Sequence, residues 1–465
     1  MKRTETDSLG SVEIDAARYW GPQTERARVL FRIGTERLPT GLIRAIGLQK
    51  QAAAEANLAL GELPRAVAAP IVTAAREVAE GKFDNEFPLP VWQTGSGTQT
   101  NMNANEVIAN RANEMLGHPL GARSPVHPND HVNRGQSSND SFPTVMHIAA
   151  AEAIQFLTIP CLRILADALN RRAKQWEGII KIGRTHMMDA VPITLGMECA
   201  TWACQVETGI ERLEGVMPRL LKVPQGGTAV GTGLNRHKDF DTAFCERLAA
   251  LCGLDFTPHP RKAEGISAHD VFVELSGAMN TVAVSLNKIA NDIRLLCSGP
   301  RSGLAELIVP EDGLSSSIMP GKSNPTQCEA LAMVCAQVMG NNIAITVGGA
   351  QGHLELNTFK PLIIYSILQG TRLLADAAES FAVHMVDRME PNLPQIAEHL
   401  ARSPMLVTAL APHIGYDNAV RVAKRAAEDH STLREAADKL AIVTPEDFDR
   451  WVRPERMIGP GSSEE

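Results

Sequence analysis

Apolar side chains recur at intervals of three and four residues over long stretches of this chain, most regularly between Ser267 and Cys297. That spacing lines one face of an α-helix, and in this stretch it continues for about eight turns, or roughly 45 Å. The same periodicity is found in four other stretches: Ser141–Trp176, Pro192–Leu221, Pro325–Val347 and Pro361–Val386. Aromatic residues make up only 4% of the chain, which favours close-packed helices over sheets. We therefore predict a mainly α fold with five long helices in succession and no alternating strands between them.

The segments on either side of these helices lack such long seams. Residues 1–136, which are rich in Pro and Gly, are predicted to form an N-terminal, mostly helical domain. Residues 137–391 would form a central long-helix bundle domain, and residues 392–465 a small C-terminal helical domain broken by Pro404, Pro412 and Pro445. Apolar seams of this length bury more surface than the bundle of one chain covers, so we also expect oligomerisation.

The composition argues against several classes of partner. The 465 residues include 45 Lys and Arg against 53 Asp and Glu, whereas nucleic-acid binding needs clustered positive charge. No stretch of about 18 residues is both apolar and uncharged, as a membrane span would be. The N-terminus mixes charges with no apolar run, unlike a secretory signal. The eight cysteines form no Cys-x-x-Cys pair, which favours free thiols in a reducing compartment. We expect a cytoplasmic protein that binds neither nucleic acid nor membrane.

Four polar stretches punctuated by glycine interrupt the apolar pattern: Thr94–Asn103, His127–Asn139, Gly183–Asp189 and Gly313–Asn324. Each stretch alone would be an ordinary helix cap or turn. A cap, however, needs one side-chain oxygen, whereas these stretches offer several hydroxyls and amides in a row. Together they suit a small carboxylate, which accepts several hydrogen bonds and is stabilised at helix N-termini. Partial phosphate-binding patterns around Gly95, Gly231 and Gly321 lack required glycines, so no nucleotide is predicted.

One of these stretches resembles a family signature. The segment from Ser316 to Pro325 reads Ser-Ser-Ile-Met-Pro-Gly-Lys-Ser-Asn-Pro, and it is similar to the signature of the fumarase/aspartase superfamily, within which class II fumarases match best. The resemblance extends from about Tyr19 to Pro460. It implies the three-domain, mainly α fold of that superfamily and a homotetramer in which the long helices of four chains form a twenty-helix core. It also implies active sites built from three different subunits.

The other stretches bear on the choice of reaction. His186 follows Thr185 where aspartases carry Gln, and Ser137-Ser138-Asn139-Asp140 resembles the fumarase pattern. His127, Pro128, Asn129 and Asp130 resemble a second anion site found in fumarases. The resemblance therefore implies reversible hydration of fumarate, a small dicarboxylate, to (S)-malate by anti addition of water, as in the tricarboxylic acid cycle. It implies no metal and no organic cofactor.

The resemblance also assigns roles to residues. Ser316 would take the proton from carbon, and His186, oriented by Glu329, would handle the proton of the departing water. An alternative makes His186, acting through water, the base, and the sequence does not choose between the two. Developing charge on the substrate would be stabilised by fixed donors of the signature loop. The predicted substrate-binding residues are Ser96, Gly97, Thr98, Asn101, Ser137, Ser138, Asn139, Thr185, Ser317, Lys322 and Asn324.

The chain departs from the family pattern at several positions. Leu314-Ser315 stands where the family has Pro-Gly, and Ser323 replaces Val. Because the charged residues are retained, these changes affect rate or substrate tolerance more than the class of reaction. The alternatives are an aspartase-like ammonia lyase, a hydratase of a substituted four-carbon dicarboxylate, and a catalytically silent relative. The presence of Ser316, His186 and Lys322 argues against the last of these.

Overall fold

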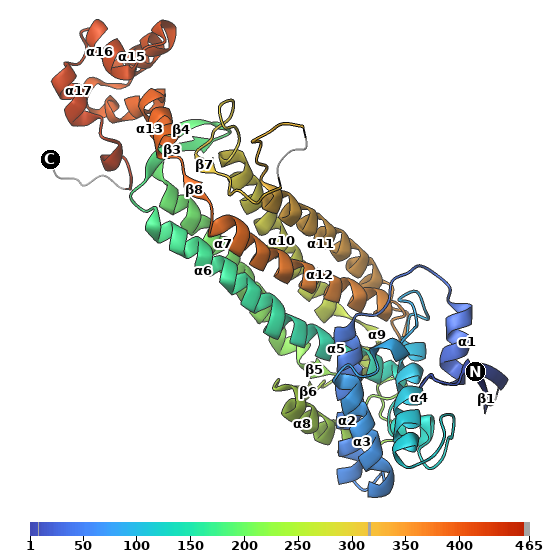
Figure 1. The fold of residues 1–465 in the computed structure, drawn as a ribbon. Helices are drawn as coiled ribbons and strands as arrows, with labels where there is room; N and C mark the ends of the chain where they lie inside the picture. Colours follow the sequence, from blue (N-terminus) through green and yellow to red (C-terminus); the bar gives the residue numbers. More distant parts are fainter. Residues whose placement is uncertain (8, 315–317, 460–465) are drawn as a thin grey trace. The chain divides into compact units, whose positions relative to one another are not determined.

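A computed structural model of the chain describes residues 1–7, 9–314 and 318–459. These residues are mainly helical, as predicted, and their short strands pair two by two (Figure 1). The N-terminal part contains β1 (Lys2–Asp7), β2 (Gly10–Asp15), α1 (Pro22–Leu30), α2 (Thr40–Ala59), α3 (Arg65–Ala79) and α4 (Thr98–Met115). A π-helical turn, η2 (Pro128–Val132), follows α4.

The five long helices predicted from the apolar seams are confirmed. The first consists of α5 (Ser138–Ala153) and α6 (Ile159–Gln175), joined by the π-helical turn η3 (Ile154–Thr158). The others are α7 (Leu195–Leu220), α10 (Asp270–Leu296), α11 (Thr326–Ala350) and α12 (Lys360–Phe381), the last continued by the π-helical turn η4 (Ala382–Val386). Short elements connect them: β5 (Lys222–Val223), α8 (Phe240–Cys252), β6 (Thr257–Pro258) and α9 (Lys262–Ser267). The seam of α10 is buried, since Leu275, Leu286 and Ile293 are 0% exposed.

The chain divides into two compact units, and the division falls within α6, α7, α10, α11 and α12. Unit 1 comprises Met1–Pro160, Gly209–Ala283 and Val334–Ala375. Unit 2 comprises Cys161–Thr208, Val284–Met333 and Asp376–Glu465. Parts of the long helices lie side by side within each unit (Figure 1). The boundaries of the three domains that the sequence predicts remain a prediction.

Unit 1 is organised around α2, which packs against α3, α4, α5 and α8 and is therefore buried on nearly all its faces. A helix enclosed in this way normally carries apolar side chains all round.

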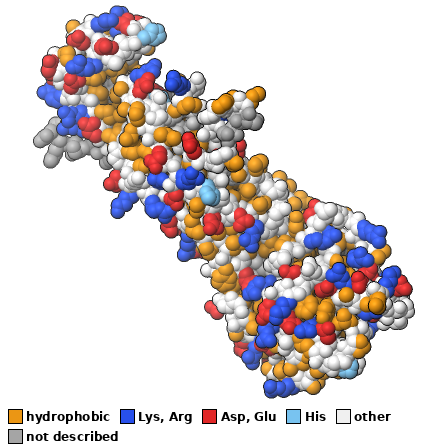
Figure 2. Space-filling view, in the orientation of Figure 1, with side chains coloured by type: hydrophobic (Ala, Val, Ile, Leu, Met, Phe, Trp, Pro, Cys, Tyr) orange, Lys and Arg blue, Asp and Glu red, His pale blue; other side chains and the backbone are white. Residues whose placement is uncertain are grey.

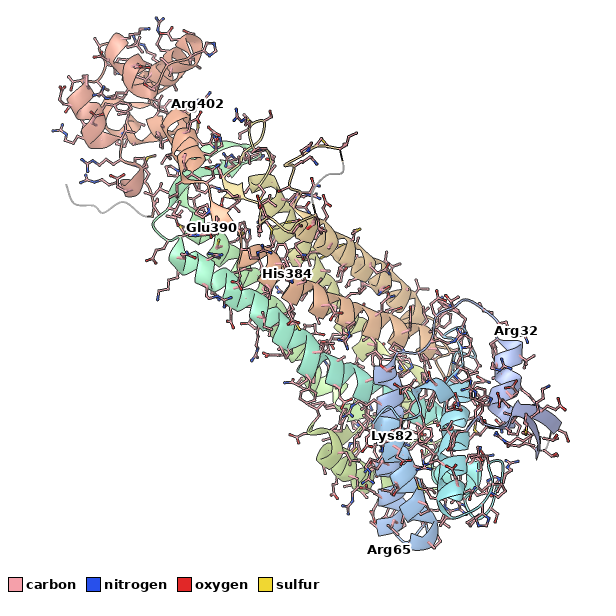
Figure 3. The ribbon with its side chains drawn as sticks, viewed as in Figure 1. Arg32, Arg65, Lys82, His384, Glu390 and Arg402 are labelled. Atoms are coloured by element: carbon pink, nitrogen blue, oxygen red, sulfur yellow. The ribbon has the colours of Figure 1, made fainter. Side chains whose placement is uncertain are left out.

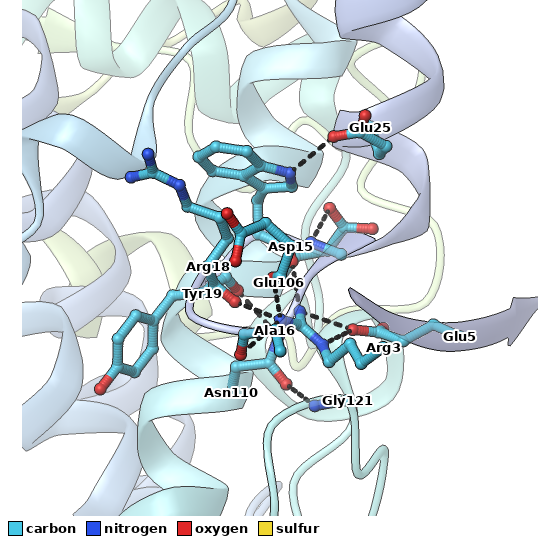
Figure 4. A network of polar contacts seen from close by, with 12 residues as sticks. Arg3, Glu5, Asp15, Ala16, Arg18, Tyr19, Glu25, Glu106, Asn110 and Gly121 are labelled. Atoms are coloured by element: carbon cyan, nitrogen blue, oxygen red, sulfur yellow. Dashed lines mark hydrogen bonds and ion pairs between the residues drawn. The ribbon is translucent and has the colours of Figure 1, made fainter. Parts of the chain in front are cut away.

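The N-terminal hairpin and α1 are tied to this core by polar contacts (Figure 4). Arg3 donates to the carbonyl oxygen of Trp20 at 2.7 Å, and Glu106 on α4 accepts from the backbone N–H of Gly21 at 2.9 Å. The same carboxylate accepts from Thr24 and so caps the first turn of α1.

Unit 2 contains the other part of the bundle and the C-terminal helices. Strands β7 (Leu307–Ile308) and β8 (Glu390–Pro391) pair with each other. After them come α13 (Leu393–Arg402), the 3₁₀ turn η5 (Pro404–Ala409), α14 (Ala411–Ile414), α15 (Tyr416–Asp429), α16 (Leu433–Lys439) and α17 (Pro445–Trp451). Leu410, Val422 and Ala436 form the buried centre of these helices and are 0% exposed.

A β-hairpin lies between α6 and α7, where the sequence predicted no strands. Strands β3 (Ile180–Thr185) and β4 (Met188–Thr194) pair antiparallel with Ile182 opposite Pro192. The prediction that a helix begins at Pro192 was therefore wrong, since α7 begins at Leu195. Proline suits the first turn of a helix, but it is equally tolerated in a two-stranded hairpin, where every strand is an edge.

Helix α11 leaves an apolar stripe at the surface of the single chain. Met333, Ile343 and Val347 are 69%, 67% and 51% exposed, and the exposed Ala336 and Gly340 lie between them at spacings of three and four. Figure 2 shows hydrophobic side chains at the surface over the long helices.

Two stretches, Ser138–Gln175 and Thr326–Ala350, are long and apolar enough to cross a membrane by length and composition alone. Core helices of soluble proteins also pass this test.

Candidate active site

Three hydroxyl groups meet in unit 1, where α4 and α5 begin. Thr98 Oγ1 lies 2.8 Å from Ser96 Oγ and 2.8 Å from Ser138 Oγ. Thr98 is the first residue of α4 and Ser138 the first of α5, so this hydroxyl cluster (Ser96, Thr98, Ser138) lies at the positive ends of two helix dipoles. Hydroxyl donors at helix N-termini are suited to bind a carboxylate.

The glycines of the first polar stretch allow the loop before α4 to pack tightly. A Cβ on Gly95 would lie 1.3 Å from the carbonyl oxygen of Thr358. Gly97 has φ +76°, and a Cβ there would lie 2.3 Å from the ring of Phe142. Gly97 is thus required by the backbone as the N-cap of α4. Its predicted role in substrate binding stays a prediction.

The other predicted ligands of unit 1 have partners within the protein. Ser137 Oγ accepts from the backbone N–H of Asn139 at 3.1 Å and caps α5. Asn139 Nδ2 donates to the carbonyl oxygen of Ala229 at 2.9 Å. Asn101 Nδ2 donates to Asn133 Oδ1 at 3.2 Å. These side chains surround the hydroxyl cluster and fix the loops that carry it.

Asp140 holds two loops together from a fully buried position. Its carboxylate accepts from the backbone N–H of Ser137, Gly226 and Thr228 at 2.9, 2.9 and 2.8 Å. Burial raises the pKa of Asp140 to about 6, against the opposing effect of these three donors. The carboxylate thereby joins the start of α5 to the loop that follows β5.

The predicted second anion site lies at the start of η2, also in unit 1. His127 Nδ1 accepts from the backbone N–H of Asn129 at 3.3 Å and of Asp130 at 3.2 Å. Burial lowers the pKa of His127, in keeping with a neutral ring whose Nδ1 is an acceptor. The ring therefore occupies the two N–H groups that an anion would use. An anion entering here would have to displace the imidazole from them.

Thr185 and His186 lie in unit 2, at the tip of the β3–β4 hairpin. His186 and Met187 form its two-residue loop with φ +56° and +66°. Such a turn prefers Asn-Gly, because both central residues need positive φ. Non-glycine residues in this conformation store strain of a kind that persists at functional sites. Thr185 and His186 are exposed in the single chain.

Buried charges anchor the base of this hairpin. Lys181 Nζ on β3 lies 2.7 Å from Glu306 Oε2 and 2.8 Å from Glu198 Oε2. Arg184 Nη2 lies 2.7 Å from Glu306 Oε1, and His399 Nδ1 on α13 lies 3.0 Å from the same oxygen. Burial alone would raise the pKa of Glu306, but these partners outweigh it, so the pKa is lowered.

The described part of the signature segment also lies in unit 2. Lys322 is exposed, and its Nζ donates to Asn324 Oδ1 at 2.6 Å. Asn324 lines a cavity of about 350 Å³ whose wall also includes Arg388 and His384. Figure 3 labels His384. Ser316 and Ser317, the predicted base and loop donor, lie outside the described residues.

Glu329, predicted to orient His186, is exposed on α11. Among the described residues, its carboxylate and the imidazole of His186 share no hydrogen bond or ion pair. Unit 1 thus brings Ser96, Thr98 and Ser138 together, while His186 and Glu329 in unit 2 are not joined within one chain. In the described chain, no group of three His, Cys, Asp or Glu side chains lies close enough to hold a metal ion.

The sequence analysis did not identify the buried charged residues that support the candidate site residues. Glu306 and Asp140 lie beside polar stretches that were singled out, yet neither was predicted to have a role. Lys50 lies in the middle of α2, where a lysine reads as part of a solvated helix face. A usable signal was its position, since Ile43, Ile46 and Ala54 recur on the same face at helical spacing and are buried.

Comparisons with known proteins give one consistent result. Residues 10–340 match the Lyase family, and residues 406–459 match the family described as fumarase C C-terminus. The chain is 57% identical over 459 residues to fumarate hydratase class II 2 of Bradyrhizobium diazoefficiens, an alignment that covers 99% of this chain and 97% of that protein. It is 55% identical over 460 residues to the mitochondrial fumarate hydratase of Rattus norvegicus, covering 98% and 90%.

The fold gives the same answer as the sequence comparison. The crystal structure of recombinant class II fumarase from Schistosoma mansoni superposes on this chain with a TM-score of 0.96 and 41% sequence identity. The match covers 98% of this chain and 99% of that one.

Proposed function

This chain belongs to the class II fumarase family, and from that membership we propose that it catalyses the reversible hydration of fumarate to (S)-malate. It is a carbon–oxygen lyase of the hydro-lyase class, EC 4.2.1.2. The observation that carries the proposal is the hydroxyl cluster, in which Ser96, Thr98 and Ser138 meet at the N-termini of two helices. A dianion of four carbons needs such a cluster for one of its carboxylates.

The chemistry follows from the acidity of the substrate. In the elimination direction a proton leaves the carbon beside one carboxylate, and negative charge develops on that carboxylate. Lys322 and Asn324, which lie 2.6 Å apart, would stabilise this charge. Ser316 would accept the proton once its alkoxide is stabilised by positive charge and N–H groups. His186 would pass the other proton to the departing hydroxyl. These roles need no metal ion, so we propose metal-independent catalysis.

We propose a homotetramer in which different chains complete each active site. Two features of the single chain support it. The apolar stripe of α11 is exposed, as subunit interfaces are before assembly. His186 and Glu329 are exposed and share no hydrogen bond or ion pair in one chain. Sedimentation should give the mass of four chains of 50.2 kDa each; a stable monomer with full activity would contradict it.

We propose that the protein lies in the cytoplasm and catalyses a step of the tricarboxylic acid cycle. All eight cysteines lie within the described residues, none of them forms a disulfide, and five are buried. Free thiols in this number are usual in a reducing compartment. Fractionation of the native host with an antibody against the chain tests this placement, and recovery in a membrane or extracellular fraction would overturn it.

A substrate panel tests the reaction directly. The protein would be incubated separately with malate, fumarate, aspartate, mesaconate and tartrate, with and without a chelator, and followed through the ultraviolet absorbance of the double bond. We expect fumarate from malate, none from aspartate, and no loss of rate with chelator. Activity on aspartate alone would replace the hydratase by an ammonia lyase. Fast hydration of mesaconate with little on fumarate would indicate the substituted substrate.

A further inference from the structure

A lysine ammonium group of unit 1 is buried without an anionic partner among the described residues. Lys50, in the middle of α2, is 1% exposed. Its Nζ donates to Gln136 Oε1 at 3.0 Å and to Asn133 Oδ1 at 3.2 Å, both amide oxygens. Among the described residues, no carboxylate lies within ion-pair distance of it. A buried cation without an ion-pair partner is rare, because its desolvation is unfavourable.

The partners of Lys50 connect it to both helices that carry the hydroxyl cluster. Asn133 Oδ1 also accepts from Asn101 Nδ2 and Asn105 Nδ2 on α4, each at 3.2 Å. Gln136 immediately precedes Ser137, the N-cap of α5. One amide therefore lies between Lys50 and the first turns of α4, and another between Lys50 and the start of α5. The ammonium is thus linked, through one amide on each side, to the helix starts that carry Thr98 and Ser138.

The charged groups around Lys50 do not neutralise the positive charge of its ammonium group. Of the ionisable groups on α3, α4, α5 and α8, which pack against α2, the one whose charge acts on Lys50 is Asp140 on α5. That carboxylate already accepts three backbone N–H bonds. Burial lowers the pKa of Lys50 to about 7, with Asp140 opposing the shift. Burial thus brings Lys50 close to the point of losing its proton at neutral pH.

We propose that Lys50 is a positioning residue for the carboxylate-binding surface of unit 1, which acts by placing a buried positive charge behind Thr98 and Ser138. The inference rests on the proposed function, because it takes the hydroxyl cluster as the carboxylate site. A bound dianion favours the protonated form of Lys50, so dicarboxylate binding and protonation of Lys50 strengthen each other. No direct contact between Lys50 and substrate is involved.

The sign of the pH dependence follows. Below pH 7 Lys50 is protonated in both the free and the bound protein, and affinity is highest. As pH rises through about 7, the free protein loses this proton whereas the complex keeps it, so affinity falls. Binding of a dicarboxylate at pH 7 to 8 is therefore accompanied by uptake of a fraction of a proton by the protein. Succinate, a saturated four-carbon dicarboxylate that cannot be hydrated, allows the measurement without turnover.

Two substitutions, one that removes the charge of Lys50 and one that keeps it, separate this role from a merely structural one. K50M removes the charge, so the Kd for succinate should rise about tenfold at pH 6.5 and no longer change with pH through Lys50. K50R keeps the charge at every pH, so the Kd should stay within about threefold of the original at pH 6.5 and not rise between pH 7 and 9. A structural role would move both variants alike. K82M, at an exposed lysine after α3 (Figure 3), is the control and should match the parent protein.

Isothermal titration calorimetry of the assembled protein with succinate, in buffers of different ionisation enthalpy, gives both Kd and proton uptake. We expect uptake near pH 7.5 in the parent protein and a smaller uptake in K50M and K50R. If neither variant folds, absence of proton uptake by the parent protein would still overturn the proposal. So would a folded K50M with unchanged Kd and uptake. Failure of the proposed hydratase activity would appear separately, as absent turnover of fumarate alongside intact succinate binding.

Discussion

Glu306 and Lys181 form an ion pair that is removed from solvent: their charged atoms are 2.7 Å apart, and the two side chains are 0% and 1% exposed. Lys181 lies on β3, four residues before Thr185, and Glu306 lies just before β7. The hairpin that presents His186 is therefore fixed at its base by a salt bridge within the protein. Its tip, in contrast, is exposed and has a strained turn.

E306Q should weaken this anchor. The substitution keeps the shape of the side chain but leaves Arg184 without its carboxylate, and loss of one partner from a buried pair destabilises by about 3 kcal/mol. We expect a clear drop in melting temperature and a lower kcat at unchanged protein concentration. E398Q, which removes an exposed ion pair with Arg402, is the matched control and should behave like the parent protein. Equal melting temperatures for E306Q and E398Q would contradict the anchoring role.

T98V should weaken substrate binding without disturbing the fold. Valine has the shape of threonine but no hydroxyl, and a hydrogen bond to a charged group contributes about 1.5 to 3 kcal/mol. The KM for fumarate should rise by about tenfold or more. T73V removes an exposed hydroxyl bonded to the carbonyl oxygen of Ala69 and should leave KM as it was. Steady-state kinetics decide between these outcomes, and an unchanged KM in T98V would remove the hydroxyl cluster from the carboxylate site.

Mixtures of two inactive variants test whether different chains complete one site. H186N and S316A should each be tetrameric and nearly inactive. If His186 and Ser316 act in one site but come from different chains, random co-assembly restores both residues in about one quarter of the sites. Co-expressed variants with separable tags, purified for both tags, should therefore regain a measurable fraction of activity. Activity no higher than that of either variant alone would place both residues in the same chain.

Acid stability should depend on the buried histidine His147. Its ring lies 4.9 Å from that of Phe272, and its Nδ1 lies 2.6 Å from the carbonyl oxygen of Leu220. Burial lowers its pKa to about 4, so below pH 6.5 the unfolded chain binds a proton that the folded chain does not. Stability is thus lost as pH falls, by about 3 kcal/mol at pH 4. H147Q should flatten the decline in melting temperature between pH 6.5 and 4.5, measured at fixed protein concentration.

The long helices were predictable because their signal is long. In α10, the seam that includes Leu275, Leu286 and Ile293 repeats over many turns, and the observed helix begins and ends within a few residues of the prediction. The β3–β4 hairpin was missed because apolar and polar residues do not alternate strictly along its strands of six and seven residues, and Pro192 suits a helix start as well. Strand pairing here depends on tertiary context more than on the local pattern.

The site was predictable to the extent that it consists of motifs. Ser96, Thr98 and Ser138 were identified as members of polar stretches, and the structure places the hydroxyl of Thr98 2.8 Å from each of the other two hydroxyls. Lys50 and Glu306 were not identified, because a charged residue in a helix or loop is usually solvated. For Lys50, the local signal was the helical face that it shares with the apolar and buried Ile43, Ile46 and Ala54. The burial of both charged residues results from packing between segments far apart in the chain, which no single stretch records.

If the exposed stripe of α11 is a subunit interface, as proposed above, it also affects the chain before assembly. A newly synthesised chain carries Met333, Ile343 and Val347 uncovered into a crowded solution, where apolar surfaces of any origin compete for them. Productive assembly and aggregation are then rival bimolecular reactions of the same helix face. The yield of native enzyme should fall when synthesis outpaces pairing, and it should recover with slower expression or with a chaperone that shields the stripe.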